Sequence, residues 1–202
     1  MSEPVSIQWF PGHMAKTRRL MTESLPLIDG VAEIIDARIP ISSRNPELDA
    51  IIKDKPRIVL MNKADIADES ANKKWIAFFK ARGTEALPVD CKTGKGLSGF
   101  SDKVNAVMGD RLKKFKEKGM TGRTLRLMVV GIPNVGKSSF INRMAKSGKA
   151  KVADRPGVTR GTQWFSIGKG IELMDTAGVL WPKFDDPAVG ERLAFTGAVK
   201  DV

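Results

Sequence analysis

The chain has 202 residues, 42% of them hydrophobic, which is enough for one or two folded domains with a real core. Its 34 Lys and Arg residues against 23 Asp and Glu residues give a formal net charge of +11. This charge favours binding to a polyanionic partner, and a nucleic acid is favoured over a membrane. The alternative is a basic surface that only keeps the protein soluble. The single cysteine, Cys91, excludes an intramolecular disulfide, and no apolar run approaches membrane-spanning length, so we expect a cytoplasmic protein without a membrane partner.

The first 30 residues are expected to form an N-terminal segment in front of the main domain. Pro11-Gly12 marks a turn, and a helix is predicted from about Met14 to Leu25. His13, the only histidine of the chain, follows that turn. A lone histidine in such a place usually starts a helix or lies on the surface.

Apolar runs over 31–37 and 57–61 predict two buried strands. The first run is followed by Arg38-Ile39-Pro40, where the proline indicates the start of a loop. The other elements expected before the second half of the chain are a short helix ending near Ile52, a helix over 72–82, a strand over 86–89, a helix over 97–108, and a basic helix end with a linker over 111–126.

The strand over 57–61 leads directly into Asn62-Lys63-Ala64-Asp65, which fits the N-K-x-D pattern of guanine recognition. The carboxylate of Asp65 can accept hydrogen bonds from N1–H and from the exocyclic amine of guanine, and adenine offers no such pair. Asn62 is expected to tie this loop to the phosphate loop and the base, and the stem of Lys63 to cover the base plane. Four residues alone are weak evidence for guanine recognition. The evidence becomes strong because a strand precedes them and the same chain has a phosphate loop.

A second base-contacting loop is expected after the strand over 86–89. GTPases typically have S-A-K there, and this chain has Asp90-Cys91-Lys92, so Cys91 and Lys92 occupy the matching places. Because the backbone makes most of this contact, the changed side chains are expected to cost little. Cys91 is predicted to be a small packing residue rather than a reactive thiol.

A phosphate-binding loop is the strongest signal in the chain. The residues from Gly131 to Ser138 fit G-x-x-x-x-G-K-[ST] without a mismatch, between an apolar strand over 125–130 and a predicted helix. The loop N–H groups and the helix N-terminus point donors at the phosphates. Lys137 is expected to reach the β- and γ-phosphates, and Ser138 to hold Mg²⁺. The nucleotide-binding residues expected here are Pro133, Asn134, Val135, Gly136, Lys137, Ser138 and Ser139.

Two further segments fit the switch elements of a GTPase. A hairpin is predicted over 163–167 and 171–174, and its second strand leads into D-T-A-G at 175–178, which fits D-x-x-G. Asp175 is expected to orient Mg²⁺ through water, and the N–H of Gly178 to sense the γ-phosphate. Thr159 lies in the preceding loop, where a switch threonine would ligate Mg²⁺ and bind the γ-phosphate. Loss of that phosphate would release both segments.

The order of these motifs differs from that of a Ras-like GTPase, in which the phosphate loop comes first and the base loops last. Here the two base loops come first. Because the termini of a compact domain often lie close together, a circular permutation keeps the site and moves the ends. We therefore expect an α/β P-loop NTPase fold of the Ras-like GTPase class, circularly permuted, with a mostly parallel central sheet flanked by helices over 31–188.

Further motifs accompany N-K-A-D and the phosphate loop: W-F-P-G-H-M at 9–14, D-A-R-x-P at 36–40, P-G-V-T at 156–159 and D-T-A-G-V-L-W-P at 175–182. In these motifs the chain resembles the circularly permuted GTPases, most closely the RbgA (YlqF) family of ribosome-assembly GTPases. The resemblance implies GTP hydrolysis as a switch in assembly of the large ribosomal subunit, with GTP or GDP, Mg²⁺, ribosomal RNA and a subunit precursor as ligands and partners of a monomer. Family members carry a C-terminal helical RNA-binding domain, so residues 189–202 are expected to begin such a segment and to be truncated.

Val179 stands directly after D-T-A-G, where Ras-like enzymes place a water-orienting glutamine, so hydrolysis is expected to be slow without help. The resemblance suggests His13 as that help, acting on the γ-phosphate once a ribosomal partner orders the N-terminal segment. A capping or packing role for His13 stays equally open. Asn134 resembles the asparagine of potassium-activated GTPases, which implies a K⁺ site beside the phosphates and faster hydrolysis in KCl than in NaCl. The expected catalytic residues are His13, Lys137 and Thr159.

Two other hypotheses stay open. The chain can be an RNA-binding module in which the nucleotide is structural and turns over little. It can also be an ATPase with a phosphate loop, although Asp65 argues against adenine. Turnover stimulated by ribosomal subunits would distinguish a GTPase from the RNA-binding module. Competition between ATP and GTP would distinguish a GTPase from the ATPase.

Overall fold

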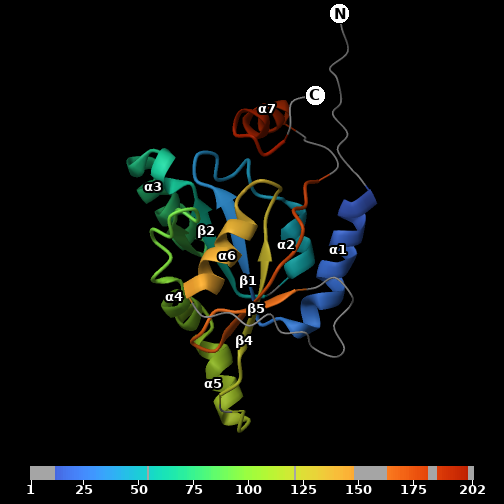
Figure 1. The fold of residues 1–202 in the computed structure, drawn as a ribbon, viewed down its shortest axis with the longest axis vertical. Helices are drawn as coiled ribbons and strands as arrows, with labels where there is room; N and C mark the ends of the chain where they lie inside the picture. The colour runs from blue at the N-terminus through green and yellow to red at the C-terminus, as the bar shows by residue number, and fades with distance from the viewer. Residues whose placement is uncertain (1–11, 54, 121, 148–162, 182–185, 200–202) are drawn as a thin grey trace, which may run out of the picture.

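The computed structural model describes residues 12–53, 55–120, 122–147, 163–181 and 186–199. Figure 1 shows one central sheet with helices on both of its faces. The sequence-based expectations for the turn at Pro11, for the P-G-V-T segment with Thr159, and for Pro182 lie outside the described residues. His13 lies in the first described helix, but its side chain is also outside the described part.

Six strands of the described chain form the sheet, in the order β3-β2-β1-β4-β6-β5. Every neighbouring pair is parallel except β5 with β6, so the expected mostly parallel sheet is confirmed. The strands that lead into the two base loops and the strand that leads into the phosphate loop therefore share one sheet. Their bounds are β1 Gly30–Asp36, β2 Arg57–Asn62, β3 Glu85–Pro88, β4 Leu125–Val130, β5 Trp164–Ser166 and β6 Ile171–Met174.

Seven α-helices occur among the described residues. None of them combines the length and hydropathy that crossing a bilayer requires. They are α1 Gly12–Ser24, α2 Glu47–Ile52, α3 Glu69–Lys80, α4 Phe100–Val107, α5 Gly109–Glu117, α6 Lys137–Ser147 and α7 Pro187–Phe195, with 3₁₀ turns at Leu25–Leu27 and Ala64–Ile66.

Two helices in the first half differ from the sequence-based expectation. α3 begins three residues before the expected range of 72–82, because the side chain of Asp68 accepts a hydrogen bond from the backbone N–H of Ala71 (2.6 Å) and caps the helix. The helix expected over 97–108 is shorter, and a break at Met108 separates α4 from α5. The hydrophobic pattern predicted the helices but not these ends, which local hydrogen bonds and backbone angles decide.

The C-terminal helix also differs in its ends. α7 begins before the expected range of 189–202, because the side chain of Asp186 accepts a hydrogen bond from the backbone N–H of Ala188 (2.9 Å). It ends at Phe195, whose side chain is 90% exposed. Figure 1 shows α7 beyond the end of the sheet, close to the loops that follow β4 and β1.

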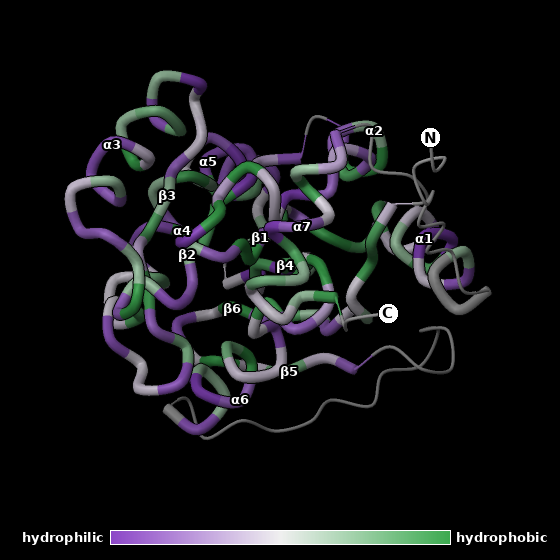
Figure 2. The backbone as a smooth tube through the Cα atoms, turned by 90° about the horizontal axis from the view of Figure 1, so that it is seen from above, coloured by the Kyte–Doolittle hydropathy of each residue, from purple (hydrophilic) through white to green (hydrophobic). Residues whose placement is uncertain are grey.

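Apolar side chains cover both faces of the sheet. On one face Ala32 and Ile34 pack in a cluster with α4, α5 and α6, in which the rings of Phe100 and Phe140 meet edge to face with centroids 5.1 Å apart. On the other face Val31 packs with side chains of α1 and α2. Figure 2 shows hydrophobic segments gathered around the central strands. Since both faces are buried, polar loops can gather only at the strand ends, which is where ligands bind in open parallel sheets.

Candidate nucleotide-binding site

One buried side chain joins the loops that the sequence analysis assigned to guanine and to phosphate. The Nδ2 of Asn62, at the end of β2, donates to the carbonyl oxygen of Val135 in the phosphate loop (2.7 Å). Its Oδ1 accepts from the backbone N–H of Cys91 in the second base loop (2.9 Å). A Cβ on Gly136 would lie 2.2 Å from Asn62 Nδ2, so only glycine allows this approach. The three loops therefore form one structural unit, although 73 residues separate Asn62 from Val135.

The phosphate loop is closed by its own lysine. The Lys137 ammonium is buried and donates to the carbonyl oxygens of Gly131 (3.1 Å) and Ile132 (2.8 Å). Burial lowers the pKa of Lys137 to about 8, and the nearby Asp175 carboxylate opposes that shift. Gly131 has a φ of 153°, and a Cβ there would lie 2.5 Å from the carbonyl oxygen of Ile34. In the described part of the chain no carboxylate is in direct contact with this lysine, so its charge suits an anion.

A cavity of about 370 Å³ lies between the phosphate loop and the D-x-x-G segment. The two walls approach closely, since a Cβ on Gly178 would lie 2.6 Å from the backbone nitrogen of Pro133. Burial raises the pKa of Asp175 above its ordinary value, and the Lys137 ammonium opposes this. The lining residues are Pro133, Asn134, Lys137, Ser138, Gln163, Asp175, Thr176, Ala177 and Gly178.

The donor set of this cavity fits Mg²⁺. Ser138 and Asp175 supply a hydroxyl and a carboxylate, the hard oxygen ligands that Mg²⁺ prefers, and Mg²⁺ commonly takes one or two protein ligands together with substrate phosphates. The described residues contain no group of three or more His, Cys, Asp or Glu that could hold a metal ion. A magnesium ion here would therefore take its remaining ligands from phosphate oxygens and water.

The first base loop has a backbone that few residues adopt. Lys63 has a φ of 62° and a ψ of 32°, in the left-handed region, and its ammonium lies 2.9 Å from Oδ2 of Asp36. Asp65 follows in the 3₁₀ turn and is exposed, so its carboxylate is available to a ligand. The backbone of Ala64 is held by the segment before the second base loop, because the Ala64 N–H donates to the carbonyl oxygen of Val89 (3.1 Å).

Asp90 shapes the second base loop, a role that the sequence analysis did not assign to it. Its carboxylate accepts from the hydroxyl of Thr93 and from the backbone N–H groups of Lys92 (2.8 Å) and Thr93 (3.2 Å), and these bonds lower its pKa. An aspartate that bonds the backbone two residues on is a common turn residue. Cys91 is buried in the main core cluster, and this burial raises the pKa of its thiol to about 12.

The expected potassium ligand contacts the C-terminal helix region. Asn134 has a φ of 57°, and its Nδ2 donates to the carbonyl oxygen of Gly197 (3.2 Å), just after α7. Its Oδ1 accepts no hydrogen bond from the described residues. Of the expected site residues, Ser139 is exposed at the start of α6, and Thr159 and the side chain of His13 lie outside the described part.

Comparison with known proteins agrees with this geometry. Residues 126–200 match the family model described as "50S ribosome-binding GTPase". The chain is 54% identical over 195 residues to ribosome biogenesis GTPase A of Bacillus licheniformis, covering 96% of this chain and 69% of the relative. For the protein of the same name from Bacillus cereus the identity is 53%, covering 96% of this chain and 66% of the relative.

A solved structure, GNP-bound YlqF from T. maritima, is similar with a TM-score of 0.63 and 27% identity, covering 91% of this chain and 66% of that one. The chain spans about two thirds of the length of these relatives. With its base loops before its phosphate loop in one sheet, it has the circularly permuted P-loop GTPase fold. The chain belongs to the ribosome biogenesis GTPase A family.

Proposed function

We propose that this chain binds GTP and GDP and hydrolyses GTP as a switch in assembly of the large ribosomal subunit. The single observation that carries the proposal is the Asn62 side chain, which bonds both the phosphate loop and the second base loop. A pocket built in this way can hold a base and its phosphates at once. The names of the relatives, ribosome biogenesis GTPase A, and of the GNP-bound neighbour support both the ligand and the process.

Each group in the pocket has a role in this proposal. Lys137 exchanges its two loop carbonyls for the β- and γ-phosphates, and Asp65 accepts from the guanine base, flanked by Lys63, Ala64, Cys91 and Lys92. Ser138, Asp175 and Thr159 are the residues that would hold Mg²⁺, which neutralises phosphate charge when it is bound. Gly178 senses the γ-phosphate through its N–H, as in other GTPase switches.

Val179 supports slow turnover in the isolated chain. Its side chain is buried in the core cluster of α1 and α2, and its backbone N–H donates to the carbonyl oxygen of Gly131 (3.3 Å). Asn45 Nδ2 donates to the Val179 carbonyl oxygen (3.1 Å) and holds the segment in place. This position therefore supplies no group that orients water. We propose that His13 acts on the γ-phosphate when a ribosomal particle orders the N-terminal segment, and that K⁺ at Asn134 adds charge.

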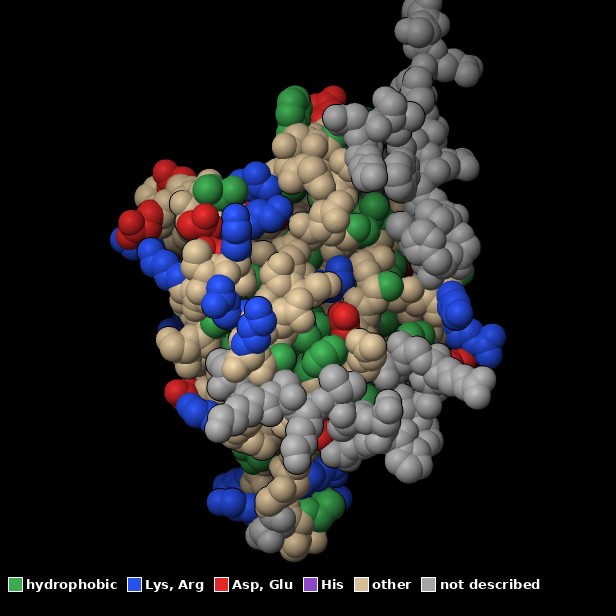
Figure 3. Space-filling view, in the orientation of Figure 1, with side chains coloured by type: hydrophobic (Ala, Val, Ile, Leu, Met, Phe, Trp, Pro, Cys, Tyr) green, Lys and Arg blue, Asp and Glu red, His purple; other side chains and the backbone are tan. Residues whose placement is uncertain are grey.

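A basic surface supports ribosomal RNA as the partner. Lys113, Lys114 and Lys116 of α5, with Lys118 and Arg123 of the following linker, form what we call the α5 basic surface; all are exposed. Its four lysines form no ion pair with any acidic residue that the structure describes. Figure 3 shows blue side chains gathered on α5, at the end of the molecule away from α7. Phosphate backbones bind such surfaces mainly by charge.

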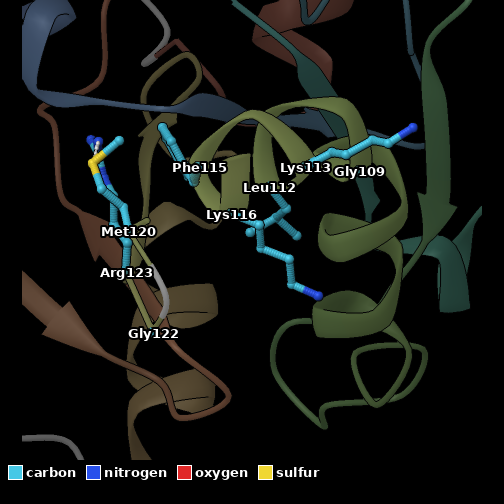
Figure 4. Close-up of a pocket in the computed structure, with 8 residues that line it drawn as sticks. All are labelled: Gly109, Leu112, Lys113, Phe115, Lys116, Met120, Gly122 and Arg123. Atoms are coloured by element: carbon cyan, nitrogen blue, oxygen red, sulfur yellow. Dashed lines mark hydrogen bonds between the residues drawn. The ribbon is translucent and has the colours of Figure 1, made fainter. Parts of the chain in front are cut away.

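The α5 basic surface also borders an apolar groove of about 430 Å³. Figure 4 shows Leu112 and Phe115 on α5 and Met120 on the returning linker, with Lys116 and Arg123 among the residues that line the groove. The Arg123 guanidinium lies 4.2 Å from the centre of the Phe115 ring. Apolar side chains between cations suit an unstacked base beside its phosphates, as in single-stranded RNA.

The test is nucleotide-dependent co-sedimentation with large ribosomal subunits, together with GTP turnover measured with and without them. We expect more binding with a non-hydrolysable GTP analogue than with GDP, and turnover stimulated by the subunits. Binding that ignores the nucleotide, with turnover at background, would favour the RNA-binding module instead. Equal competition by ATP and GTP would favour the ATPase, and Asp65→Asn should shift preference from guanine to xanthine nucleotides.

A further inference from the structure

The D-A-R-x-P segment has no role in the function proposed above, yet it contacts the first base loop directly. Asp36 is the last residue of β1 and is 3% exposed. The parallel register places it beside Asn62, the last residue of β2. Its Oδ2 lies 2.9 Å from the ammonium of Lys63, the second residue of N-K-A-D. The buried end of one strand thus carries the counter-ion for the base loop of the next.

Lys63 needs an anchor for two reasons. A left-handed backbone is disfavoured for a residue with a Cβ, so contacts must hold it there. The lysine stem is also long and loses much rotational freedom when it is fixed. The described residues offer its ammonium one carboxylate within ion-pair distance, that of Asp36. Without it, the stem is free to leave the position in which it can cover a base.

Arg38 completes the arrangement. Its backbone N–H and Nε donate to Oδ1 of Asp36 (3.0 and 2.9 Å), and its Nη2 donates to Oδ2 (2.7 Å). The same Nη2 donates to the carbonyl oxygen of Thr196 at the end of α7 (3.2 Å). The Asp65 carboxylate is near enough to help raise the pKa of Arg38, after the larger effect of its hydrogen bond to Asp36. Asp36 and Arg38 thus place a negative charge at Lys63 and a positive charge near Asp65.

We propose that Asp36 is a positioning residue of the guanine site, which holds Lys63 in its binding conformation before the nucleotide arrives. The inference rests on the proposed function, because it assigns the ligand of that same pocket. Pre-organisation of this kind raises affinity by reducing the ordering that binding requires. Asp36 itself acts through Lys63 and Arg38 and touches no part of the nucleotide in this proposal.

Glu33 offers a matched control on the same strand. Its side chain is 1% exposed and is also paired with two cations, at 3.0 Å from Arg44 Nε and 3.0 Å from Arg57 Nη1. Neither arginine belongs to a base loop or to the phosphate loop. Glu33→Gln therefore removes a buried, doubly paired carboxylate, as Asp36→Asn does, but away from Lys63. If Asp36 served stability alone, the two variants would behave alike.

The experiment measures GDP affinity, GTP turnover and the unfolding midpoint for Asp36→Asn, Glu33→Gln and Lys63→Met. We expect Asp36→Asn and Lys63→Met to weaken GDP binding and raise the KM for GTP by roughly tenfold, with kcat at saturation within about twofold of wild type. The double variant Asp36→Asn/Lys63→Met should bind GDP no more weakly than the single variants do, since each substitution removes the same contact. Glu33→Gln should lower the unfolding midpoint and leave GDP affinity unchanged.

Either of two results would overturn this inference and leave the proposed function standing. They are wild-type GDP affinity in Lys63→Met, and equal losses of GDP affinity in Asp36→Asn and Glu33→Gln. Lys63→Met keeps the test decisive should Asp36→Asn fail to fold, because Lys63 is half-buried and its stem is retained. A wild-type chain that binds no guanine nucleotide would instead refute the proposed function itself.

Discussion

The side-chain amide of Asn62 lies 2.7 Å from the carbonyl oxygen of Val135, and this contact joins two parts of the chain that the permutation has exchanged. In a Ras-like order the corresponding loops come in the opposite sequence. Here the parallel neighbours β2, β1 and β4 bring the two loops to one edge of the sheet, whatever their order in the chain. A pocket depends on which strand ends are adjacent, so a circular permutation can preserve it.

Asn62→Ala should weaken nucleotide binding and destabilise the fold together. The change leaves the Val135 carbonyl and the Cys91 N–H without their partner in a buried place, at a cost of about 1–3 kcal/mol in the free energy of unfolding. Urea unfolding and GDP titration measure the two effects. Asn72→Ala is the control, because Asn72 is equally buried but its Oδ1 has no hydrogen-bond partner among the residues that the structure describes. Asn72→Ala should leave GDP affinity unchanged, and equal affinity losses would contradict a joining role for Asn62.

The raised pKa of the buried Cys91 thiol should make the free energy of unfolding depend on pH. Its folded pKa of about 12 lies above the unfolded value of about 8.5, so the unfolded state releases a proton first as the pH rises. The stabilising contribution is complete below about pH 8.5 and is lost on going toward pH 12, at about 1.4 kcal/mol per pH unit. Urea unfolding of wild type and Cys91→Ala between pH 7 and pH 10 measures it.

The difference in unfolding free energy between those two proteins should be constant up to about pH 8 and then shrink. Native Cys91 should also resist alkylation at pH 8, since the thiolate is the reactive form. Rapid alkylation of the folded protein would contradict the prediction that the Cys91 thiol is buried and protonated. A difference in unfolding free energy that stays constant to pH 10 would contradict it as well.

Potassium should accelerate hydrolysis through Asn134. The Asn134 side chain lines the phosphate cavity, and its Oδ1 accepts no hydrogen bond among the described residues, so it can serve as an oxygen ligand. Turnover should be roughly tenfold or more faster in KCl than in NaCl, because a fixed charge beside the phosphates stabilises the transition state. Asn134→Ala should remove the difference. Asn142→Ala, an exposed asparagine on α6, should retain it. Equal rates in the two salts would refute the site.

The motifs of the candidate site could be recognised in the sequence because each of them is local. Strand, glycine loop and helix follow one another around Lys137, and N-K-A-D follows β2, so each was recognisable without coordinates. The Asp36–Lys63 ion pair was not, because strand order decides which carboxylate lies beside that lysine. The break at Met108 was also missed, since the apolar spacing continues through it while the backbone leaves the helix.

Charge reversal on the α5 basic surface should weaken RNA binding without affecting the nucleotide. Lys113→Glu with Lys116→Glu changes two exposed lysines that have no acidic partner among the described residues, far from the phosphate loop. Because each lost phosphate contact also lowers the number of ions released, the slope of log affinity against log salt should fall by about 1 per contact. Filter binding to large-subunit RNA at several salt concentrations measures both quantities. Lys73→Glu with Lys74→Glu on α3 makes the same change in net charge elsewhere, and equal losses in the two double variants would show that overall charge, and not this surface, binds the RNA.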